Sequence, residues 1–368
     1  MKLVMTLLAR DEADIVDANV AYHLSQGVDF VIATDHSSRD GTADLLRRYE
    51  REGVLLLREA GGEAHDQVAH VNAMARTAAL DYGADWVINN DADEFWWPLV
   101  GSLKDVVSAV PDGIGALVAS RSNFLPSVSG PEAFLERMVV REVASKNARG
   151  DPLEPKVIHR ATPEIEMAPG NHSIDAPDMA VAPDLGLLEV LHFPMRTFEQ
   201  FERKVVNVGV GYERLEGRAP EVGRDQLALL ALQREGRLRE HFDDLTVGGD
   251  GLDAALASGS LVVDTRLRDY MAAHDSRRHE MPDAIARQTV SSALGVAAKL
   301  PQVSADLERR SAELAQARAE LDQARADLAL RDQELDAARA ERESLERRLA
   351  ATDETLRTLQ SSRLMRYS

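Results

Sequence analysis

The sequence predicts an α/β protein: a mostly parallel sheet flanked by helices, then a helical region and a long C-terminal coiled-coil helix. Two observations predict the sheet flanked by helices. Short apolar runs alternate with helix-patterned segments, and polar clusters follow several of those runs. A leucine repeated every seven residues predicts the last part. We expect four regions: an α/β domain over 1–245, a helical extension over 246–299, the coiled coil over 300–360 and a short basic tail over 361–368.

Four apolar runs near the start suit strands that are buried on both faces: 2–8, 30–34, 54–57 and 85–90. Apolar residues at helical spacing predict helices between them, over 12–26, 43–52 and 66–82. This alternation indicates a parallel sheet with right-handed crossovers. Further strands are expected at 113–124, 154–160 and 186–193. Helices are expected at 197–215, at 225–241 and over most of 250–300.

The C-terminal pattern is a heptad repeat. Leucine stands at positions 300, 307, 314, 321, 328, 335, 349 and 356, and only Arg342 breaks the series. A lone helix would leave this row of leucine side chains exposed to water, so we expect pairing with a second copy or a partner helix. Small residues and arginines in the seam indicate a modest or heteromeric association. Strand number and orientation stay open.

Composition excludes several classes of function. The net charge of −19 disfavours nucleic-acid backbones and anionic lipid surfaces, whereas an acidic cleft suits a divalent cation. The absence of cysteine removes disulfides, thiolate zinc sites and cysteine nucleophiles. The first apolar run is too short for a signal peptide, and no run reaches the length of a membrane span. We expect a cytoplasmic protein, with a peripheral position at the inner face of the membrane left open.

The segment NNDADEFWWP (89–98) places Asp91 and Asp93 directly after an apolar strand. Two aspartates spaced i, i+2 in extended backbone point the same way. They can hold magnesium or manganese, whose other positions take phosphate oxygens and water. The clusters ARDE (9–12) and DHSSRD (35–40) follow the first two strands. Because ligands sit at the carboxyl ends of parallel strands, we expect the three clusters in one cleft.

These motifs, in this order, resemble family 2-like glycosyltransferases with the GT-A fold. The resemblance covers about residues 1–270 and excludes the coiled coil. Its first pieces are RDE (10–12), YHLSQG (22–27), DHSSRDGT (35–42) and DADEF (91–95). Later pieces are similar to a shorter bacterial branch: PKVIHR (155–160), GNH (170–172), LHFPMRTFEQFERKV (191–205) and GLDAALASGSLVVDTRL (251–267).

The resemblance implies transfer of a sugar from a nucleotide-diphosphate donor. By position, Arg10 and Glu12 contact the nucleotide, and Asp35 recognises its base or ribose. Asp91 and Asp93 hold the metal, which neutralises the diphosphate as it leaves. They are therefore the catalytic pair that the resemblance implies.

Several basic or neutral groups complete the expected site. His192 is the candidate third metal ligand and would favour manganese, or it is an ordinary strand-end histidine. His172 could touch the donor phosphate or assist proton transfer, or it could bond to backbone. Lys156, Arg196 and Lys204 could neutralise the diphosphate, or be ordinary surface cations.

The catalytic base cannot be chosen from the sequence. An inverting transfer, which the resemblance implies, needs a base beside the acceptor hydroxyl. The Glu-Asp pair of many family 2 enzymes is absent, and four acids lie in the right part of the chain: Glu132, Glu136, Glu142 and Asp175.

We therefore expect a metal-dependent glycosyltransferase with an unknown acceptor. No glycine-rich motif follows the first strand, which disfavours dinucleotide enzymes and sugar nucleotidyltransferases. The last residues, LQSSRLMRYS (359–368), resemble the end of bacterial surface-polysaccharide transferases and favour a role in surface glycan synthesis. The alternative is a catalytically inactive, transferase-like scaffold that assembles partners through its coiled coil.

Overall fold

The computed structural model describes residues 1–61, 67–127, 133–147, 150–215, 217 and 222–274, and beyond these only scattered helical positions. The chain divides into two units, residues 1–301 and 302–368. In the second unit, the longest described stretch is the helical segment 342–347. The rest of the predicted coiled coil falls almost wholly outside the described residues, as does the basic tail. The pairing of the coiled coil therefore stays a prediction.

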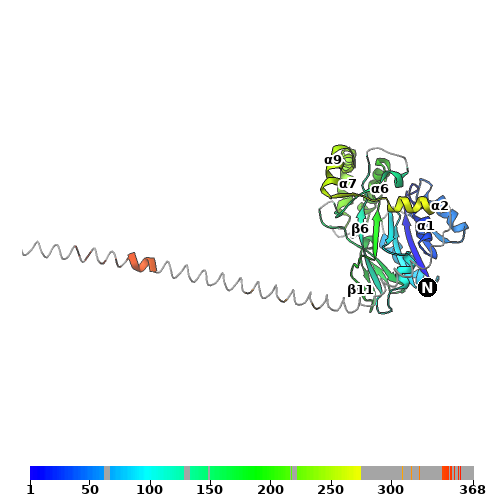
Figure 1. The fold of residues 1–368 in the computed structure, drawn as a ribbon, viewed down its shortest axis with the longest axis horizontal. Coiled ribbons are helices and arrows are strands. Elements are labelled where there is room, and N and C mark those ends of the chain that lie inside the picture. The colour runs from blue at the N-terminus through cyan, green and yellow to red at the C-terminus, as the bar shows by residue number, and fades with distance from the viewer. Residues whose placement is uncertain are drawn as a thin grey trace, which may run out of the picture. The chain divides into compact units, whose positions relative to one another are not determined.

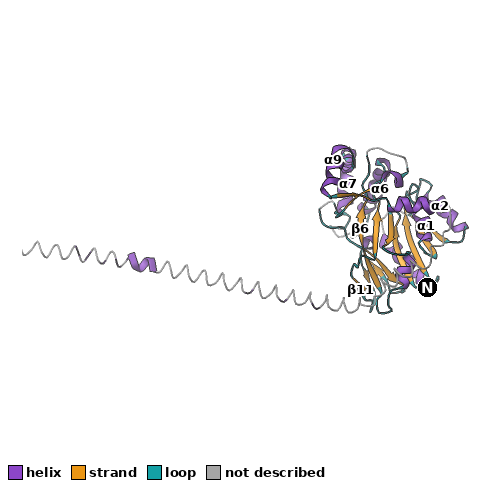
Figure 2. Ribbon diagram, in the orientation of Figure 1, coloured by secondary structure: helices purple, strands orange, loops and turns teal. Residues whose placement is uncertain are grey.

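Through residue 91 the elements follow the predicted alternation (Figures 1 and 2). They are β1 (Leu3–Ala9), α1 (Val16–Ser25), β2 (Phe30–Asp35), α2 (Thr42–Arg51), β3 (Leu55–Glu59), α3 (Gln67–Leu80) and β4 (Trp86–Asp91). The later elements are β5 (Glu94–Pro98), α4 (Leu103–Ser108), β6 (Ala116–Asn123), α5 (Phe134–Arg137), β7 (Val140–Glu142), β8 (Lys156–Arg160), β9 (Glu166–Met167), η1 (Pro169–Asn171), β10 (Ile174–Asp175), β11 (Val181–Ala182), β12 (Leu188–His192), α6 (Phe198–Glu213), α7 (Arg224–Arg234), α8 (Leu238–Leu245), α9 (Gly249–Ser258), β13 (Leu261–Val263) and α10 (Arg266–His274).

The main sheet joins nine of the described strands in the order β3-β2-β1-β4-β8-β6-β12-β5, with β11 paired to β6. The strands β3, β2, β1 and β4 are parallel, which confirms the predicted alternation. Strand β8 is antiparallel to β4 and β6, and β5 is antiparallel to β12. The sheet is therefore mixed, with an unbroken parallel block built from the first half of the domain.

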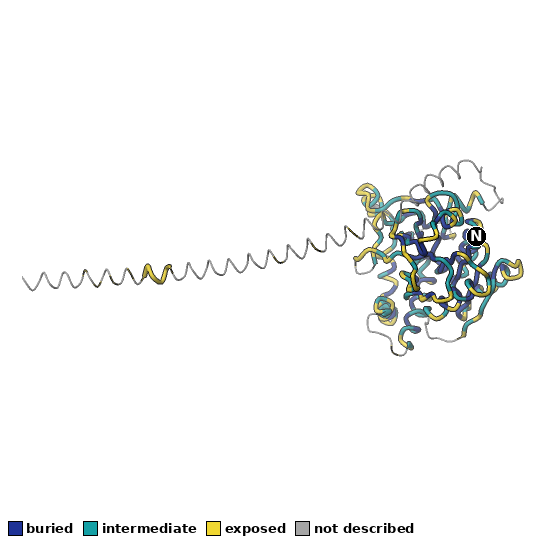
Figure 3. The backbone as a smooth tube through the Cα atoms, turned by 90° about the horizontal axis from the view of Figure 1, so that it is seen from below, coloured by how far each residue is buried: buried dark blue, intermediate teal, exposed yellow. Residues whose placement is uncertain are grey.

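Strand β1 shows why helices cover both faces of the sheet. Its odd-numbered residues Leu3 to Ala9 join a core with residues of α1 and α2, whereas Val4 joins a second core with α3. Successive side chains of a strand point to opposite faces, so a nearly continuous apolar run needs cover on both. Figure 3 shows the resulting buried interior. Polar side chains therefore lie mainly at the ends of the strands.

The aromatic residues after the acidic motif form β5, a strand that the sequence pattern did not predict. Phe95 and Trp96 are fully buried. Phe95 packs edge-on against Tyr22 of α1 and Phe193 after β12. Trp96 belongs to the main core. The acids thus sit in a tight connection between two buried strands, which fixes their backbone on both sides.

One helical prediction was wrong in detail. Residues 225–241 fall into two helices, α7 and α8, because the chain turns at Gly236, where φ is 72°. The described part of the segment 250–300 ends at His274 and is mostly helical, as expected, but it also contains β13, which pairs with β7. Residues 275–300 lie outside the described residues. Arg266 of α10 bonds to Glu189 of β12, so this segment is tied to the α/β domain. Within the described residues, no helix combines the length and apolar character needed to cross a membrane.

Two buried histidines predict how stability depends on pH. Burial lowers the pKa of His23 and of His159 to about 4. The unfolded chain takes up these protons near pH 6.5, while the folded chain resists them. Stability is therefore full above pH 6.5 and falls as the pH drops toward 4, by up to about 3 kcal/mol for each histidine. Urea unfolding between pH 7.5 and 4.5 measures this. His23→Gln should flatten the profile, whereas His241→Gln, at a half-buried histidine of α8, should not.

Candidate functional site

Three strand ends meet at one edge of the sheet. In the parallel register Ala9 of β1 lies opposite Asp35 of β2, and Leu8 lies opposite Asp91 of β4. The polar segments after these strands therefore begin side by side, as predicted. Helix α6 comes to the same edge, because its Lys204 contacts the acidic motif after β4.

Lys156 of β8 binds two acids of the motif. Its Nζ lies 2.7 Å from Asp91 Oδ2 and 2.9 Å from Glu94 Oε2. Arg121 of β6 adds a contact to Glu94 at 3.3 Å. Burial acts to raise the pKa of Asp91, but Lys156 outweighs it and the pKa is lowered. The Lys156 side chain is 1% exposed, so these pairs are a fixed part of the interior.

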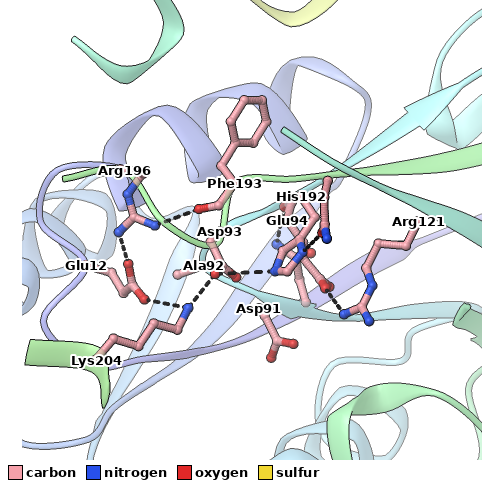
Figure 4. A network of polar contacts seen from close by, with 12 residues as sticks. Glu12, Asp91, Ala92, Asp93, Glu94, Arg121, His192, Phe193, Arg196 and Lys204 are labelled. Carbon is pink, nitrogen blue, oxygen red and sulfur yellow. Dashed lines mark hydrogen bonds and ion pairs between the residues drawn. The ribbon is translucent and has the colours of Figure 1, made fainter. Parts of the chain in front are cut away.

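Asp93 has different partners (Figure 4). Its Oδ2 accepts a hydrogen bond from Lys204 Nζ and lies 3.6 Å from His192 Nε2. Lys204 Nζ is also 3.5 Å from Glu12 Oε1. Burial acts to raise the pKa of Asp93, yet Lys204 and His192 hold it well below the usual range. The Asp91 carboxylate stands apart from these contacts, so the two aspartates are bound by different cations.

Arg196 ties the loop after β1 to the segment before α6. Its guanidinium contacts Glu12 and Asp14, and it donates to the carbonyl of Phe193 at 3.0 Å. Burial raises the pKa of Glu12, against the opposing effect of Arg196 and Lys204. The Arg196 side chain is fully buried and paired with these acids, and a contact with a donor diphosphate stays a prediction. Of the three cations predicted to make this contact, only Lys204 is a third exposed.

Helix α6 places Lys204 at the site because its polar and apolar residues lie on different sides of the helix. Lys204 stands between Phe201 and Asn207, each three residues away, at the border of the polar side. Asn207 Nδ2 donates to Asp11 Oδ2 at 2.7 Å, in the loop after β1. Phe201 and Val205 belong to an apolar core with α7 and α8. Packing of the apolar face thus turns the polar face toward the strand ends.

His192 ends β12 beside Asp93. Its Nδ1 lies 2.7 Å from Asn123 Oδ1. In the neutral tautomer that carries its proton on Nδ1, this nitrogen donates to Asn123 Oδ1 and Nε2 keeps a lone pair. Burial lowers the pKa of His192, against the opposing effect of Asp93. A neutral imidazole held through its other nitrogen is in the form that ligates metals.

Asp93 and His192 together fit a divalent cation as two adjacent donors. Phosphate oxygens and water can fill the other positions of such a cation. Asp91, the other aspartate of the predicted metal-binding pair, contacts Lys156. Across the part of the chain that the structure describes, no group of three or more His, Asp or Glu side chains is arranged to hold a metal ion. The two donors therefore suit a cation that is shared with a bound phosphate.

The Gly170–His172 loop approaches Asp91 through Asn171, whose Nδ2 lies 3.4 Å from Asp91 Oδ1. His172 Nδ1 bonds to the carbonyl of Pro155 at 2.9 Å, and burial lowers the pKa of His172. Gly170 has a φ of 73°, and a Cβ there would lie 2.5 Å from the His172 ring. The ring thus helps to fold the loop, and a role for His172 in proton transfer stays a prediction.

A cavity of about 590 Å³ opens beside Asp35, at the ends of β2 and β3 and the start of α2. Asp35 Oδ2 accepts from Ser38 N at 3.2 Å, but Oδ1 is buried and has no hydrogen-bond partner among the described residues. Arg10 Nε is in the same situation. Leaving buried polar atoms unpaired costs free energy, which hydrogen bonds to a ligand would recover.

Strained backbone gathers around the same edge. Three of the four non-glycine residues with left-handed φ in the described chain lie in these loops: Asp11 at 55°, Ser37 at 59° and Asn171 at 59°. Such conformations cost free energy and concentrate at functional sites. Hydrogen bonds hold them here; Asp11 Oδ1, for example, accepts from Arg39 N at 2.7 Å.

The structure describes three of the four candidate bases: Glu136 on α5, Glu142 on β7 and Asp175 on β10. Glu132 lies outside the described residues. Burial raises the pKa of Glu142, which hydrogen-bonds to Ser145. The Ser145 hydroxyl also accepts from Asn123 N at 2.8 Å, next to His192. These contacts do not identify the base, which stays open.

Sequence reasoning missed the polar residues that position the acids: Gln67, Arg121, Asn123, Asn171 and Asn207. Gln67 is typical, because it begins α3 and donates to Asp91 Oδ1 at 3.1 Å. Gln67 and Asn123 stand at the ends of predicted elements, as the acids do. Their location at the ends of predicted elements could have marked them as candidates. It does not indicate which residue at the end of an element faces the site.

A comparison with protein-family models matches a region that includes the strand ends described above. The model of glycosyltransferase family 92 matches residues 8–172, which run from β1 to His172. The motifs predicted similarity to a glycosyltransferase family, and the matching model is that of family 92 rather than family 2. No curated protein matches the sequence.

Solved structures are only distantly similar. S. aureus TarS 1–349 is 14% identical with a TM-score of 0.33, over 75% of this chain and 91% of that chain. Its complex with UDP-GlcNAc is 15% identical with a TM-score of 0.35, over 75% of this chain and 91% of that chain. Glucosyl-3-phosphoglycerate synthase from Mycobacterium tuberculosis, in complex with Mn²⁺, UDP and glucosyl-3-phosphoglycerate, is 13% identical with a TM-score of 0.22, over 33% and 44%. The large mixed sheet flanked by helices agrees with the GT-A fold that the motifs implied.

The buried lysine predicts a large change in stability. Lys156→Met leaves Asp91 without its cation and Glu94 with Arg121 alone, so unfolding should become easier by about 3–5 kcal/mol. Lys104→Met removes a half-exposed pair with Asp29 and should cost at most about 1 kcal/mol. Urea unfolding of both variants measures the difference. Equal losses would contradict the structural role given to Lys156.

Proposed function

We propose that the protein is a metal-dependent glycosyltransferase that moves a sugar from a nucleoside-diphosphate sugar to an acceptor hydroxyl. One observation carries the proposal: Asp35, with its cavity, and the acids after β4 start at aligned strand ends. The family 92 match over residues 8–172 supports it, because it covers these strand ends. Cytoplasmic location, a role in surface glycan synthesis and self-association stay predictions.

The nucleoside belongs at Asp35. Its unpaired Oδ1 can accept from a base N–H or a ribose hydroxyl, and the cavity gives the ligand room. Strands β2 and β4 are separated by β1 alone, so their ends lie about 10 Å apart by ordinary strand spacing. The ribose and the phosphates then extend along this edge toward Asp93.

The diphosphate belongs beside Lys204 and the pair formed by Asp93 and His192. A divalent cation held by this pair would supply charge neutralisation for the leaving diphosphate. Lys204 can donate hydrogen bonds to the same phosphate oxygens, since it is the exposed cation of the site. Lys156 and Arg196 act by holding Asp91 and Glu12 in position.

The reaction breaks the bond between the sugar C1 and the donor phosphate oxygen. The acceptor oxygen forms the new bond to C1 and gives its proton to a base, and the nucleoside diphosphate leaves with the electron pair. Attack opposite the leaving group inverts C1, which is the outcome that we propose. The acceptor and the base are not assigned.

Asparagine substitutions test the acidic pair. Asp93→Asn should reduce Mn²⁺-dependent hydrolysis or transfer from a panel of nucleotide sugars by at least about 100-fold, because the leaving charge loses its neutralising group. Asp91→Asn should reduce it too, through the loss of a positioned carboxylate. Asp85→Asn, at a half-exposed aspartate before β4, is the matched control. If both site variants keep wild-type rates, the acidic pair is not the catalytic centre; if the wild type acts on no nucleotide sugar of the panel, the inactive-scaffold alternative is favoured.

The nucleoside site has its own test. Asp35→Ala should weaken binding of the best ligand among UDP, GDP, CDP and ADP by about 10- to 100-fold, since one hydrogen bond to a charged group is lost. Asp44→Ala, at an exposed aspartate lining the same cavity, should change binding little. Isothermal titration calorimetry measures both. Equal effects would move the nucleoside away from Asp35.

A further inference from the structure

Two lysines neutralise the Asp-x-Asp motif, and they differ in freedom. Lys156 is 1% exposed and lies between Asp91 and Glu94. Lys204 is 35% exposed and comes from a helix that joins this edge through polar contacts. One lysine is therefore enclosed by the carboxylates that it pairs, whereas the other can leave Asp93 by rotating its own side chain.

Lys204 occupies the position that a divalent cation needs. It contacts Asp93 Oδ2, the same oxygen that lies 3.6 Å from His192 Nε2. A cation bound to that oxygen and to Nε2 sits about 2.0–2.1 Å from each, for an ion such as Mg²⁺. The ammonium and the cation would then share one carboxylate oxygen at close range, where like charges repel strongly.

Lys204 can also form ion pairs with groups other than Asp93. Glu12 Oε1 is already 3.5 Å from Nζ, so a small rotation keeps the ammonium paired. The donor phosphates are the second destination, at the same edge of the sheet. Arg196 holds Glu12 in place through that carboxylate's other oxygen.

We propose that Lys204 is an exchangeable counter-cation: the divalent cation displaces it from Asp93, and the released ammonium then binds the donor diphosphate. This inference rests on the proposed function, because it needs a cation and a diphosphate at this edge. It gives the two aspartates different tasks. Asp93 exchanges one cation for another, whereas Asp91 keeps Lys156.

The exchange predicts opposite effects of one substitution on two ligands. Lys204→Gln removes the competitor, so it should bind Mn²⁺ alone about ten-fold more tightly than the wild type. It should also bind a nucleoside diphosphate in the presence of saturating Mn²⁺ more weakly, because a phosphate contact is lost. A merely structural lysine would not tighten Mn²⁺ binding.

The experiment is calorimetric titration of the full chain with Mn²⁺ alone, and then with UDP, GDP, CDP or ADP at saturating Mn²⁺. Arg203→Gln makes the same charge change at an exposed neighbouring position and should leave Mn²⁺ affinity within about two-fold. Lys204→Arg keeps a competing charge and should not tighten binding. Thermal unfolding establishes that each variant is folded.

Three results are distinguishable. Tighter Mn²⁺ binding by Lys204→Gln alone supports the exchange. Equal or weaker Mn²⁺ binding by the folded Lys204→Gln variant overturns the exchange and leaves the proposed function standing. If neither the wild type nor the variant binds Mn²⁺, the proposed cation site fails together with the exchange.

Discussion

The arrangement of the site depends on one electrostatic constraint: three acids within four residues are packed at the end of a buried strand. Asp93 and Glu94 are almost fully buried, and such charges are tolerated in an interior only when each is paired. The pairing groups come from β6, β8 and α6, all later in the chain than the motif. Neutralising the motif therefore draws these later elements onto the parallel strands, and the site forms where they meet.

The parallel half of the fold could be predicted from the sequence because its signals are local. A continuous apolar run such as 85–90 specifies a buried strand, and an acid that follows it must lie at the strand end. The partners of the acids could not be predicted in the same way. Lys156 and Lys204 are 65 and 111 residues from the aspartates that they bind, and nothing in the spacing of the chain records those contacts. Strand β5 was missed because its aromatic run, Phe95 to Trp97, lacks a clear alternation of polar and apolar positions.

The structure also changes how the Asp-x-Asp motif is understood. From the sequence, Asp91 and Asp93 form an equivalent pair that faces one cation. In the structure Asp91 lies against an enclosed lysine, while Asp93 lies between an exposed lysine and a neutral histidine. The difference follows from position: Asp91 is the last residue of β4, next to β8, and Asp93 lies in the connection to β5, where Lys204 of α6 contacts it. The two neighbouring carboxylates therefore have different surroundings, which is the basis for the different roles that we propose for them.

We propose that one edge of the sheet binds a nucleoside diphosphate at Asp35 and a divalent cation at Asp93. Anomalous diffraction from crystals soaked with Mn²⁺ and the best-binding nucleoside diphosphate tests it most directly. We expect a manganese peak in contact with Asp93, His192 and a phosphate oxygen, with the nucleoside in the cavity beside Asp35. A manganese peak or a nucleotide at any other place on the domain would contradict it.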